Sequence, residues 1–225
     1  MNKTYKNIQD NVLAMVSRSD TETRNRIKSW INLGQQDFVS RELWPFREEV
    51  AQIAVESGTR EYVLTDNLSD SIDANNIVSV VSLGNNGRKL SYVPFQGLRT
   101  LHPDLSVGSG PPEVYYLRAG SIGFYPTPSA DSVIEVDYYI VPADLEADDD
   151  ESIIPLTYRE ALFQYALSFE HDYNSDPDLA VKAMNRYEQI LISARVNLLN
   201  QPVDSGAFRI AGPANSEWTS LPGER

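Results

Sequence analysis

An abrupt change of periodicity between Trp30 and Val50 constrains the fold of this chain more than any other feature. Before it, apolar residues recur at three- and four-residue spacing, which predicts one buried face of a helix. After it, the side chains alternate with the period of two that is typical of a partly buried strand. Pro45 cannot continue a helix, and it biases Trp44 toward an extended backbone. We therefore expect the helix to end within a residue or two of Leu43.

Helical patterns also mark the rest of the N-terminal part. The stretch from Asn7 to Val16 is amphipathic, which predicts a first short helix that packs through its apolar side. Ser19 and Glu22 have the spacing of a capping box, in which a hydroxyl and a carboxylate accept hydrogen bonds from backbone amides. We expect the second helix to begin at this pair.

The C-terminal part has the clearest helical pattern in the sequence. Thr157 and Glu160 form a second candidate capping box, and apolar residues follow it at helical spacing. Asp176 is suited to cap a last helix, with Pro177 at the first helical position, where a missing amide proton costs nothing. The apolar stripe of this helix ends before Pro202.

Between these helices, residues 47–142 show strand patterns and turn signals. Ser57 to Thr59 separates two expected strands and contains a glycine that suits a hairpin turn. Gly84 to Gly87 contains an Asn-Gly step, the strongest short-range signal for a hairpin. We expect a loop over Asp66 to Asn76 and a brief helical turn over Phe95 to Leu101. The expected strands are residues 49–55, 61–64, 77–83, 89–93, 113–117, 121–125 and 132–141.

This order of elements predicts an α+β fold. We expect a helical bundle built from the N- and C-terminal helices, with an antiparallel β-domain inserted between them. The expected strands are enough for a small barrel or sandwich. The predicted boundaries are residues 1–46 and 143–200 for the helical core, 47–142 for the inserted β-rich domain and 201–225 for an extended C-terminal tail.

The composition argues against several classes of protein. With no cysteine and two histidines, disulfides and Cys/His metal sites are absent or nearly so. No apolar stretch is long enough for a signal peptide or a membrane span, so we expect a soluble protein made in a reducing compartment. The net charge is −13, and only residues 1–46 carry more basic than acidic side chains. A chain so acidic lacks the basic stripe that stable nucleic-acid binding requires.

Six carboxylates crowd into the eight residues from Asp144 to Glu151. Their mutual repulsion predicts an exposed connector, which we call the acidic segment. A calcium-binding loop is the sharper alternative, but an EF-hand needs glycine at its sixth position, where this segment has Asp149. We therefore expect neither a bound metal nor a cofactor.

Two groups of large apolar side chains are candidates for packing. Around the junction we expect core or subunit-interface aromatics rather than a ligand cage. The C-terminal tail has no periodicity and would not fold alone, but its spaced apolar anchors suit a segment that folds onto a partner. A disordered end with incidental aromatics is the alternative for the tail. The residues are Trp30, Phe38, Trp44 and Phe46 at the junction, and Phe208, Ile210, Trp218 and Leu221 in the tail.

The sequence contains no recognisable catalytic motif. Gly108 to Gly110 runs into Pro111 and Pro112, which forbid the helix that a dinucleotide-binding fingerprint requires. His102 and His171 have no serine or cysteine nucleophile nearby in sequence, which leaves spatial neighbours open. A structural protein is therefore favoured over an enzyme.

Several segments together resemble a known family. They are the helix around Trp30, the runs LWPFREEVAQIAV and GTREYVLT, the strands in GPPEVYYL and GFYPTPS, the run VDYYIVPADLEADDDESIIP, and TYREALFQYAL. Over about residues 20–200, these landmarks are similar to those of the head-to-tail adaptor, or connector, proteins of tailed bacteriophages.

The resemblance implies a structural virion protein of the neck, at the head-tail interface, that is present in the host cytoplasm during assembly. Such proteins form a ring, usually of twelve copies, beneath the portal, and the ring prolongs the DNA channel and docks the tail. The implied partners are the portal protein, tail or neck proteins and further copies of the chain, with no membrane. By the same resemblance, the C-terminal tail reaches the portal.

An acidic wall would suit such a channel because it repels phosphates, so that DNA slides through without specific binding. We therefore predict that part of the acidic segment or of the β-domain carboxylates faces the bore. The candidates within the segment are Asp144, Glu146, Asp148, Asp149 and Asp150.

Two other functions stay open at this point. A carbohydrate-binding or fibre-attachment module of a phage tail is suggested by Tyr115, Tyr116, Tyr138 and Tyr139 on expected strands. Neighbouring strand residues point to opposite faces, so one tyrosine of each pair should be exposed or at an interface. A hydrolase that uses paired carboxylates has only the abundance of acidic residues in its favour.

Overall fold

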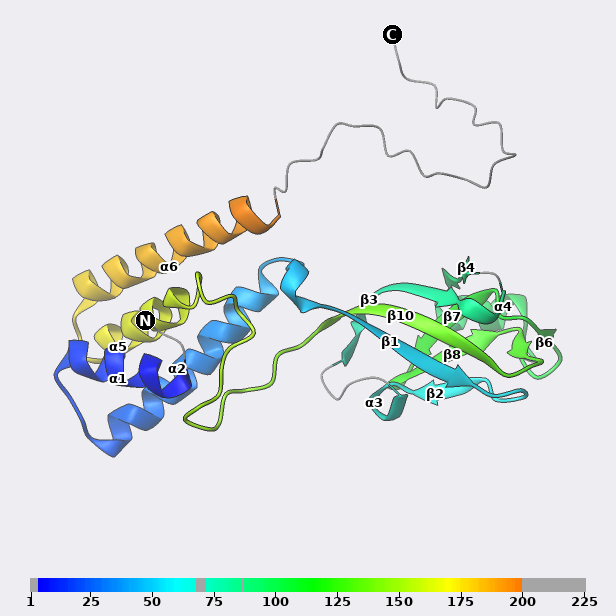
Figure 1. The fold of residues 1–225 in the computed structure, drawn as a ribbon, viewed down its shortest axis with the longest axis horizontal. Coiled ribbons are helices and arrows are strands. Elements are labelled where there is room, and N and C mark those ends of the chain that lie inside the picture. The colour runs from blue at the N-terminus through cyan, green and yellow to red at the C-terminus, as the bar shows by residue number, and fades with distance from the viewer. Residues whose placement is uncertain (1–3, 68–71, 86, 200–225) are drawn as a thin grey trace, which may run out of the picture.

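The computed structural model describes residues 4–67, 72–85 and 87–199 of the chain. Figure 1 shows the helices from both ends of the chain packed together on one side and the strands gathered on the other. Helices at the N- and C-terminal ends thus flank a β region, and the predicted α+β class is confirmed.

Among the described residues, the long helices share one hydrophobic cluster, and α5 lies against the other three. On the face predicted for the second helix, Ile27, Ile31 and Phe38 are fully buried in this cluster, whereas Trp30 is half-buried against it. Gly34 allows α2 and α5 to approach closely, because an added Cβ would lie 2.9 Å from the Tyr165 ring. The helices are α1 (Tyr5–Val16), α2 (Thr21–Ser40), α5 (Glu160–Tyr173) and α6 (Pro177–Leu198).

The N-terminal caps of the first two helices differ from the prediction. Helix α1 begins before Asn7, because the Thr4 side chain accepts a hydrogen bond from the Asn7 amide at 3.3 Å. Helix α2 is capped by Asp20 and not by Ser19, so the predicted capping box is wrong. The Asp20 carboxylate accepts both the backbone N–H and the hydroxyl of Thr23, each at 2.8 Å, which makes it the better acceptor.

The caps of the C-terminal helices were predicted with mixed success. The Thr157 capping box is wrong, because residues 156–159 form a turn and α5 begins only at Glu160, with Arg159 at the N-cap position. Asp176 does occupy the N-cap position of α6, and Pro177 is its first residue. The Asp176 side chain makes no capping hydrogen bond, so its backbone carbonyl begins the helix.

Helix α2 ends at Ser40, earlier than the predicted end near Leu43. The chain must leave the helix there because Trp44 folds back, and its indole N–H donates to the carbonyl of Phe38 at 2.8 Å. A short 3-10 helix, η1 (Pro45–Arg47), then leads into the first strand.

Two four-stranded sheets, of orders β1-β10-β3-β4 and β2-β8-β7-β5, contribute to one hydrophobic cluster as a sandwich. Two short pairings, β5 with β7 and β6 with β9, are parallel. The elements are β1 (Glu48–Val55), β2 (Glu61–Val63), α3 (Leu64–Asn67), β3 (Ile72–Ser82), η2 (Leu83–Asn85), β4 (Arg88–Lys89), β5 (Ser91–Tyr92), α4 (Phe95–Leu101), β6 (Ser109–Gly110), β7 (Val114–Arg118), β8 (Ser121–Tyr125), β9 (Thr127–Pro128) and β10 (Ser132–Ile140).

The first predicted hairpin is wrong, whereas the second is confirmed. Strand β1 pairs along its whole length with β10, and β2 pairs with β8 in the other sheet. The turn around Gly58 is therefore a corner between the sheets, held by the Ser57 amide, which donates to Asp131 at 2.8 Å. Strands β3 and β4 do pair as an antiparallel hairpin, and Gly87 has a positive φ of 71°.

The predicted loop over Asp66 to Asn76 is also wrong in part. Strand β3 already begins at Ile72, because Ile72 and Ile77 pair with residues of β10 across an irregular register. The hydrogen bonds from β10 stabilise this strand although its local sequence is polar and does not predict one. The brief helix over Phe95 to Leu101 is confirmed as α4.

Three of the four tyrosines that suggested a carbohydrate-binding surface are buried. Tyr115 is 7 % exposed and Tyr116 0 %, so the prediction of one exposed tyrosine is wrong for this pair. Both faces of β7 are covered, because Tyr115 packs in the sandwich core while Tyr116 packs under α4 against Phe95. Tyr138 is buried too, and only Tyr139 is half-buried. The carbohydrate-binding alternative loses its structural motivation.

Candidate assembly surfaces

The candidate aromatics of the junction divide into core and edge. Phe38 and Trp44 are fully buried, and their rings stack with centroids 5.1 Å apart. Phe46 continues this stack on Trp44 at 5.8 Å but is only half-buried. Trp30 is also half-buried and packs on Phe169 of α5 at 6.1 Å. Only Trp30 and Phe46 retain surface that a neighbouring molecule could contact.

Arg47 links the helices to the strands, and sequence reasoning did not select it. Its Nε donates to the carbonyl of Ile140 at the end of β10, at 2.8 Å, and its Nη1 donates to the carbonyl of Val39 in α2, at 3.0 Å. The residue is only 5 % exposed, and burial lowers the pKa of the guanidinium, which Tyr139 opposes. The only sequence feature that could have pointed to it is its position two residues after the Trp44-Pro45 pair. These hydrogen bonds hold the start of β1 and the end of β10 next to the end of α2.

The acidic segment is fastened to α2 by two polar side chains. Asn32 exchanges two hydrogen bonds with the backbone of Leu145, at 3.0 and 3.1 Å. The buried Gln35 donates to the carbonyl of Ala143 at 2.9 Å and accepts a hydrogen bond from the Ser152 hydroxyl. The segment therefore follows a defined path along the helices.

Three of the five candidate carboxylates have partners within the chain. Asp148 forms an ion pair with a lysine of α1 at 3.3 Å, and Asp144 accepts from an amide side chain of α2 at 2.9 Å. Asp150 accepts from two backbone amides of the segment, at 2.7 and 2.8 Å. Glu146 and Asp149 are exposed, and their carboxylates have no partner among the described residues. Within the same residues, no three potential ligand side chains are grouped to hold a metal ion.

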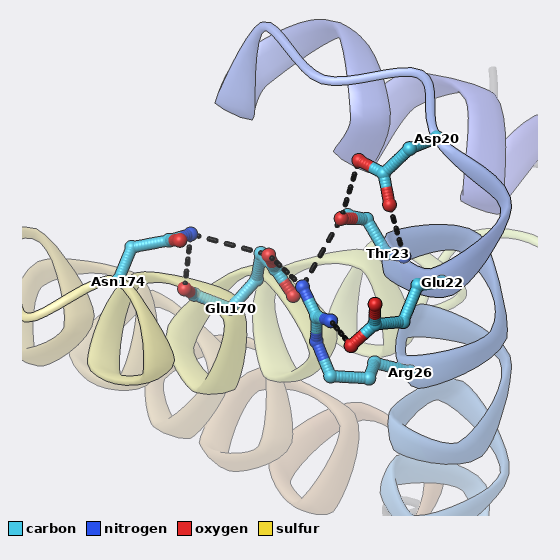
Figure 2. Close-up of polar contacts among 6 residues, drawn as sticks. All are labelled: Asp20, Glu22, Thr23, Arg26, Glu170 and Asn174. Atoms are coloured by element: carbon cyan, nitrogen blue, oxygen red, sulfur yellow. Dashed lines mark hydrogen bonds and ion pairs between the residues drawn. The ribbon is translucent and has the colours of Figure 1, made fainter.

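Figure 2 shows a second polar cluster, which joins the start of α2 to the end of α5. Arg26 forms an ion pair with Glu170 at 3.2 Å, and the Glu170 side chain is completely buried. Arg26 also contacts Glu22 at 3.3 Å and the Thr23 hydroxyl at 3.1 Å, while Asn174 donates to Glu170 at 3.1 Å. A buried carboxylate with these partners fixes the relative position of two helices.

Helix α6 lies at the edge of the helical part (Figure 1). Val181, Ile192 and Val196 are 59 %, 53 % and 50 % exposed and share one side of the helix. The residues that α6 buries, including Tyr187 and Leu191, lie on another side. We call the three exposed residues the α6 stripe.

Two shallow grooves run between α5 and α6. The first is mostly apolar and includes Val181 of the α6 stripe, with Phe169 and Met184. The second lies farther along the pair and is more polar, with Glu160 and Arg186 among its lining residues. One helix pair thus offers two chemically different surfaces.

The tail candidates Phe208, Ile210, Trp218 and Leu221 lie outside the described residues. Their assignment to a partner surface stays a prediction.

A family model described as SU10 adaptor protein matches residues 3–211. The chain belongs to this family of bacteriophage head-to-tail adaptors. The resemblance noted in the sequence is therefore confirmed. No curated protein matches the chain.

Membership of the adaptor family gives the surfaces above a context. The family is structural, and it implies association with the portal and tail proteins of a phage and a place in the virion neck. No helix in the described part of this adaptor has the length and apolar character to span a membrane.

Proposed function

We propose that this adaptor closes into a ring, of twelve copies, beneath the portal, prolongs the DNA channel and docks the tail. The α6 stripe is the observation that carries the proposal. Three aliphatic side chains, each at least half exposed, line one side of a long helix. Contiguous apolar surface marks sites of protein association, and Ile192 and Val196 lie one turn apart on this side, with Val181 three turns before them.

A ring requires two different faces on each subunit, because each copy meets its neighbours head to tail. The α5–α6 pair supplies an apolar groove with the α6 stripe and a polar groove farther along. We assign the apolar surface to one neighbour. In this arrangement residues 1–46 and 143–200 form the core of the ring, and the inserted β-rich domain, residues 47–142, extends from it.

The bore of the ring is assigned an acidic lining. Of the acidic candidates, Glu146 and Asp149 suit this role best, since both are exposed and free of ion pairs among the described residues. Asp144, Asp148 and Asp150 contribute negative charge while they hold the segment in place. Repulsion of phosphates would let DNA pass without specific binding.

The portal contact is assigned to the C-terminal tail, residues 201–225. Its apolar residues Phe208, Ile210, Trp218 and Leu221 are spaced so that each could occupy a separate site on the portal. Removal of this tail should abolish association with the purified portal while the helical part stays folded. Unchanged binding of the truncated chain would refute the assignment.

Mass measurement of the purified adaptor, alone and mixed with its portal, tests the ring. We expect a discrete high-mass species, and we expect the V181D/I192D double variant to stay monomeric under the same conditions. Val107→Asp is the matched control, because Val107 is 79 % exposed but lies in the β part. Ring formation by the double variant would exclude the α6 stripe as the subunit contact.

A further inference from the structure

Three arginines line one pocket in the β part of this very acidic chain. Arg60, Arg99 and Arg118 surround a cavity of about 250 Å³ together with Glu61 and Asp104. None of the three arginines forms an ion pair with any residue that the structure describes. Since the whole chain carries a net charge of −13, a cavity with an excess of cations is unexpected. We call it the arginine pocket.

Two of the three arginines lie over the ring of one aromatic side chain, Phe95. The guanidinium of Arg118 lies 4.6 Å from the ring centre of Phe95, and that of Arg99 lies 5.8 Å from it. Phe95 in turn packs on the buried Tyr116 at 5.2 Å, and the Tyr116 hydroxyl donates to Glu61 at 2.8 Å. A guanidinium stacked on a ring keeps its in-plane N–H donors available for an anion.

The two carboxylates of the pocket already have hydrogen-bond partners. Glu61 accepts from Tyr116, and Asp104 accepts from the backbone amide and hydroxyl of Ser106, at 2.9 and 2.6 Å. The hydrogen bonds from Ser106 lower the pKa of Asp104, with a contribution from Arg60, so this carboxylate is ionised. Three guanidinium groups against two carboxylates leave one positive charge, which a single carboxylate would balance.

We propose that the arginine pocket binds an acidic side chain from a tail-side partner protein. A planar guanidinium matches a carboxylate through paired N–H···O hydrogen bonds. A nucleic acid fits less well, because it needs a basic track that extends beyond one pocket. Helix α4, which carries Phe95 and Arg99, lies at the end of the β part far from α6 (Figure 1). The site is therefore separate from the surface assigned to neighbouring copies.

A tetraglutamate peptide with blocked ends is a suitable probe, with tetraglutamine as the uncharged control. At low salt we expect saturable binding of tetraglutamate to the full chain, measured by the fluorescence anisotropy of a dye that forms the N-terminal block of both peptides. The R99Q/R118Q double variant should weaken binding about tenfold or more, because it removes two charge-assisted contacts. R88Q should bind as the wild type does, since Arg88 is already paired with Glu113 at 3.0 Å.

Three results would overturn the proposal. The first is no saturable binding of tetraglutamate, or equal binding by R99Q/R118Q with an unchanged melting temperature. The second is displacement of the peptide by inorganic phosphate or a thymidine oligonucleotide at lower concentration than free tetraglutamate, which would assign the pocket to phosphates. The third is loss of self-association in R99Q/R118Q, which would assign it to a second copy.

The identity of the partner rests on the proposed function, but the peptide measurement does not. Repeating it on the V181D/I192D variant separates the two ideas. If neither the wild type nor V181D/I192D forms a ring but both bind the peptide, the proposal for the arginine pocket holds and only the ring proposal fails. A ring that binds no peptide would do the reverse.

Discussion

The hydroxyl of Tyr187 on α6 donates a hydrogen bond to the carboxylate of Asp37 on α2. Tyr187 is completely buried, and Asp37 is also paired with Arg41 at 3.1 Å. The two residues lie far apart in sequence, on helices from opposite ends of the chain. Their contact therefore holds α6 against the C-terminal half of α2, close to where the chain leaves the helices for the strands.

Replacement of Tyr187 by Phe should lower the free energy of unfolding by about 1–3 kcal/mol, because it removes a buried hydrogen bond to a charged group. Tyr173→Phe is the matched control on the neighbouring helix α5, since Tyr173 is 56 % exposed. We expect a change below about 0.5 kcal/mol for that control. Urea unfolding followed by circular dichroism measures both, and equal effects would contradict the assigned contact.

Stability should fall at alkaline pH because buried tyrosines resist ionisation. Burial raises the pKa of Tyr5 to about 12, and Asp144 and Asp150 add to this rise. Burial and the hydrogen bond to Glu49 raise the pKa of Tyr138 to about 12. The unfolded chain releases these protons near pH 10, so their contribution is complete below pH 10 and is lost as the pH rises to 12.

The measurement for this prediction is urea unfolding at several pH values between 9 and about 12. The free energy of unfolding should decline across the upper part of this range. A Y5F/Y138F double variant should show a flatter decline, because two of the responsible protons are removed. A pH profile identical to that of the wild type would argue against these two tyrosines.

Replacement of Arg47 by Met should destabilise the protein by about 2–4 kcal/mol, because the buried carbonyl of Val39 and the partly buried carbonyl of Ile140 lose their donor. Arg88→Met is the control, since the Arg88–Glu113 ion pair is half exposed and such pairs contribute only about 0–1 kcal/mol. Limited proteolysis should also cleave R47M faster than wild type within η1 or at the start of β1. Protection equal to that of the wild type would show that other contacts hold the junction.

Two adjacent glutamines allow a matched test of how the acidic segment is fastened. Gln35→Leu should cost about 1–3 kcal/mol, because it leaves the Ala143 carbonyl and the buried Ser152 hydroxyl without their partner. Gln36→Leu removes only an exposed contact with Asp144 and should change stability by less than about 0.5 kcal/mol. Hydrogen exchange over residues 143–152 should rise in the Gln35 variant alone. Similar exchange in both variants would contradict the proposed fastening.

Local patterns predicted most elements and the β3–β4 hairpin, but not how the other strands pair. The strands from Ser121 to Tyr125 and over most of β10 were located correctly, because alternation and turn residues act within a few positions. The pairing of β1 with β10 was missed, since nothing near Gly58 distinguishes a hairpin turn from a corner between two sheets. Tyr115 and Tyr116 show the same limit, because the second face of β7 is covered by a helix that comes earlier in the chain.

Candidate surfaces were affected in the same way. The crowding of carboxylates in residues 144–151 was evident in the sequence, but Gln35 and Asn32, which hold that segment, carry no recognisable signal. Arg60, Arg99 and Arg118 are scattered along the chain as isolated cations. They form one pocket only after three separate segments meet.

By itself, the sequence determined the class of fold, the positions of the long helices and the family. Periodicity depends on residues a few positions apart, and the order of the elements can be read directly along the chain. Only the tertiary structure decided which aromatics are buried, how Arg47 joins the two parts and where charge accumulates. These depend on contacts between residues far apart in the chain, such as Tyr187 with Asp37, and hydrogen bonding and burial at such contacts follow from packing and not from local pattern.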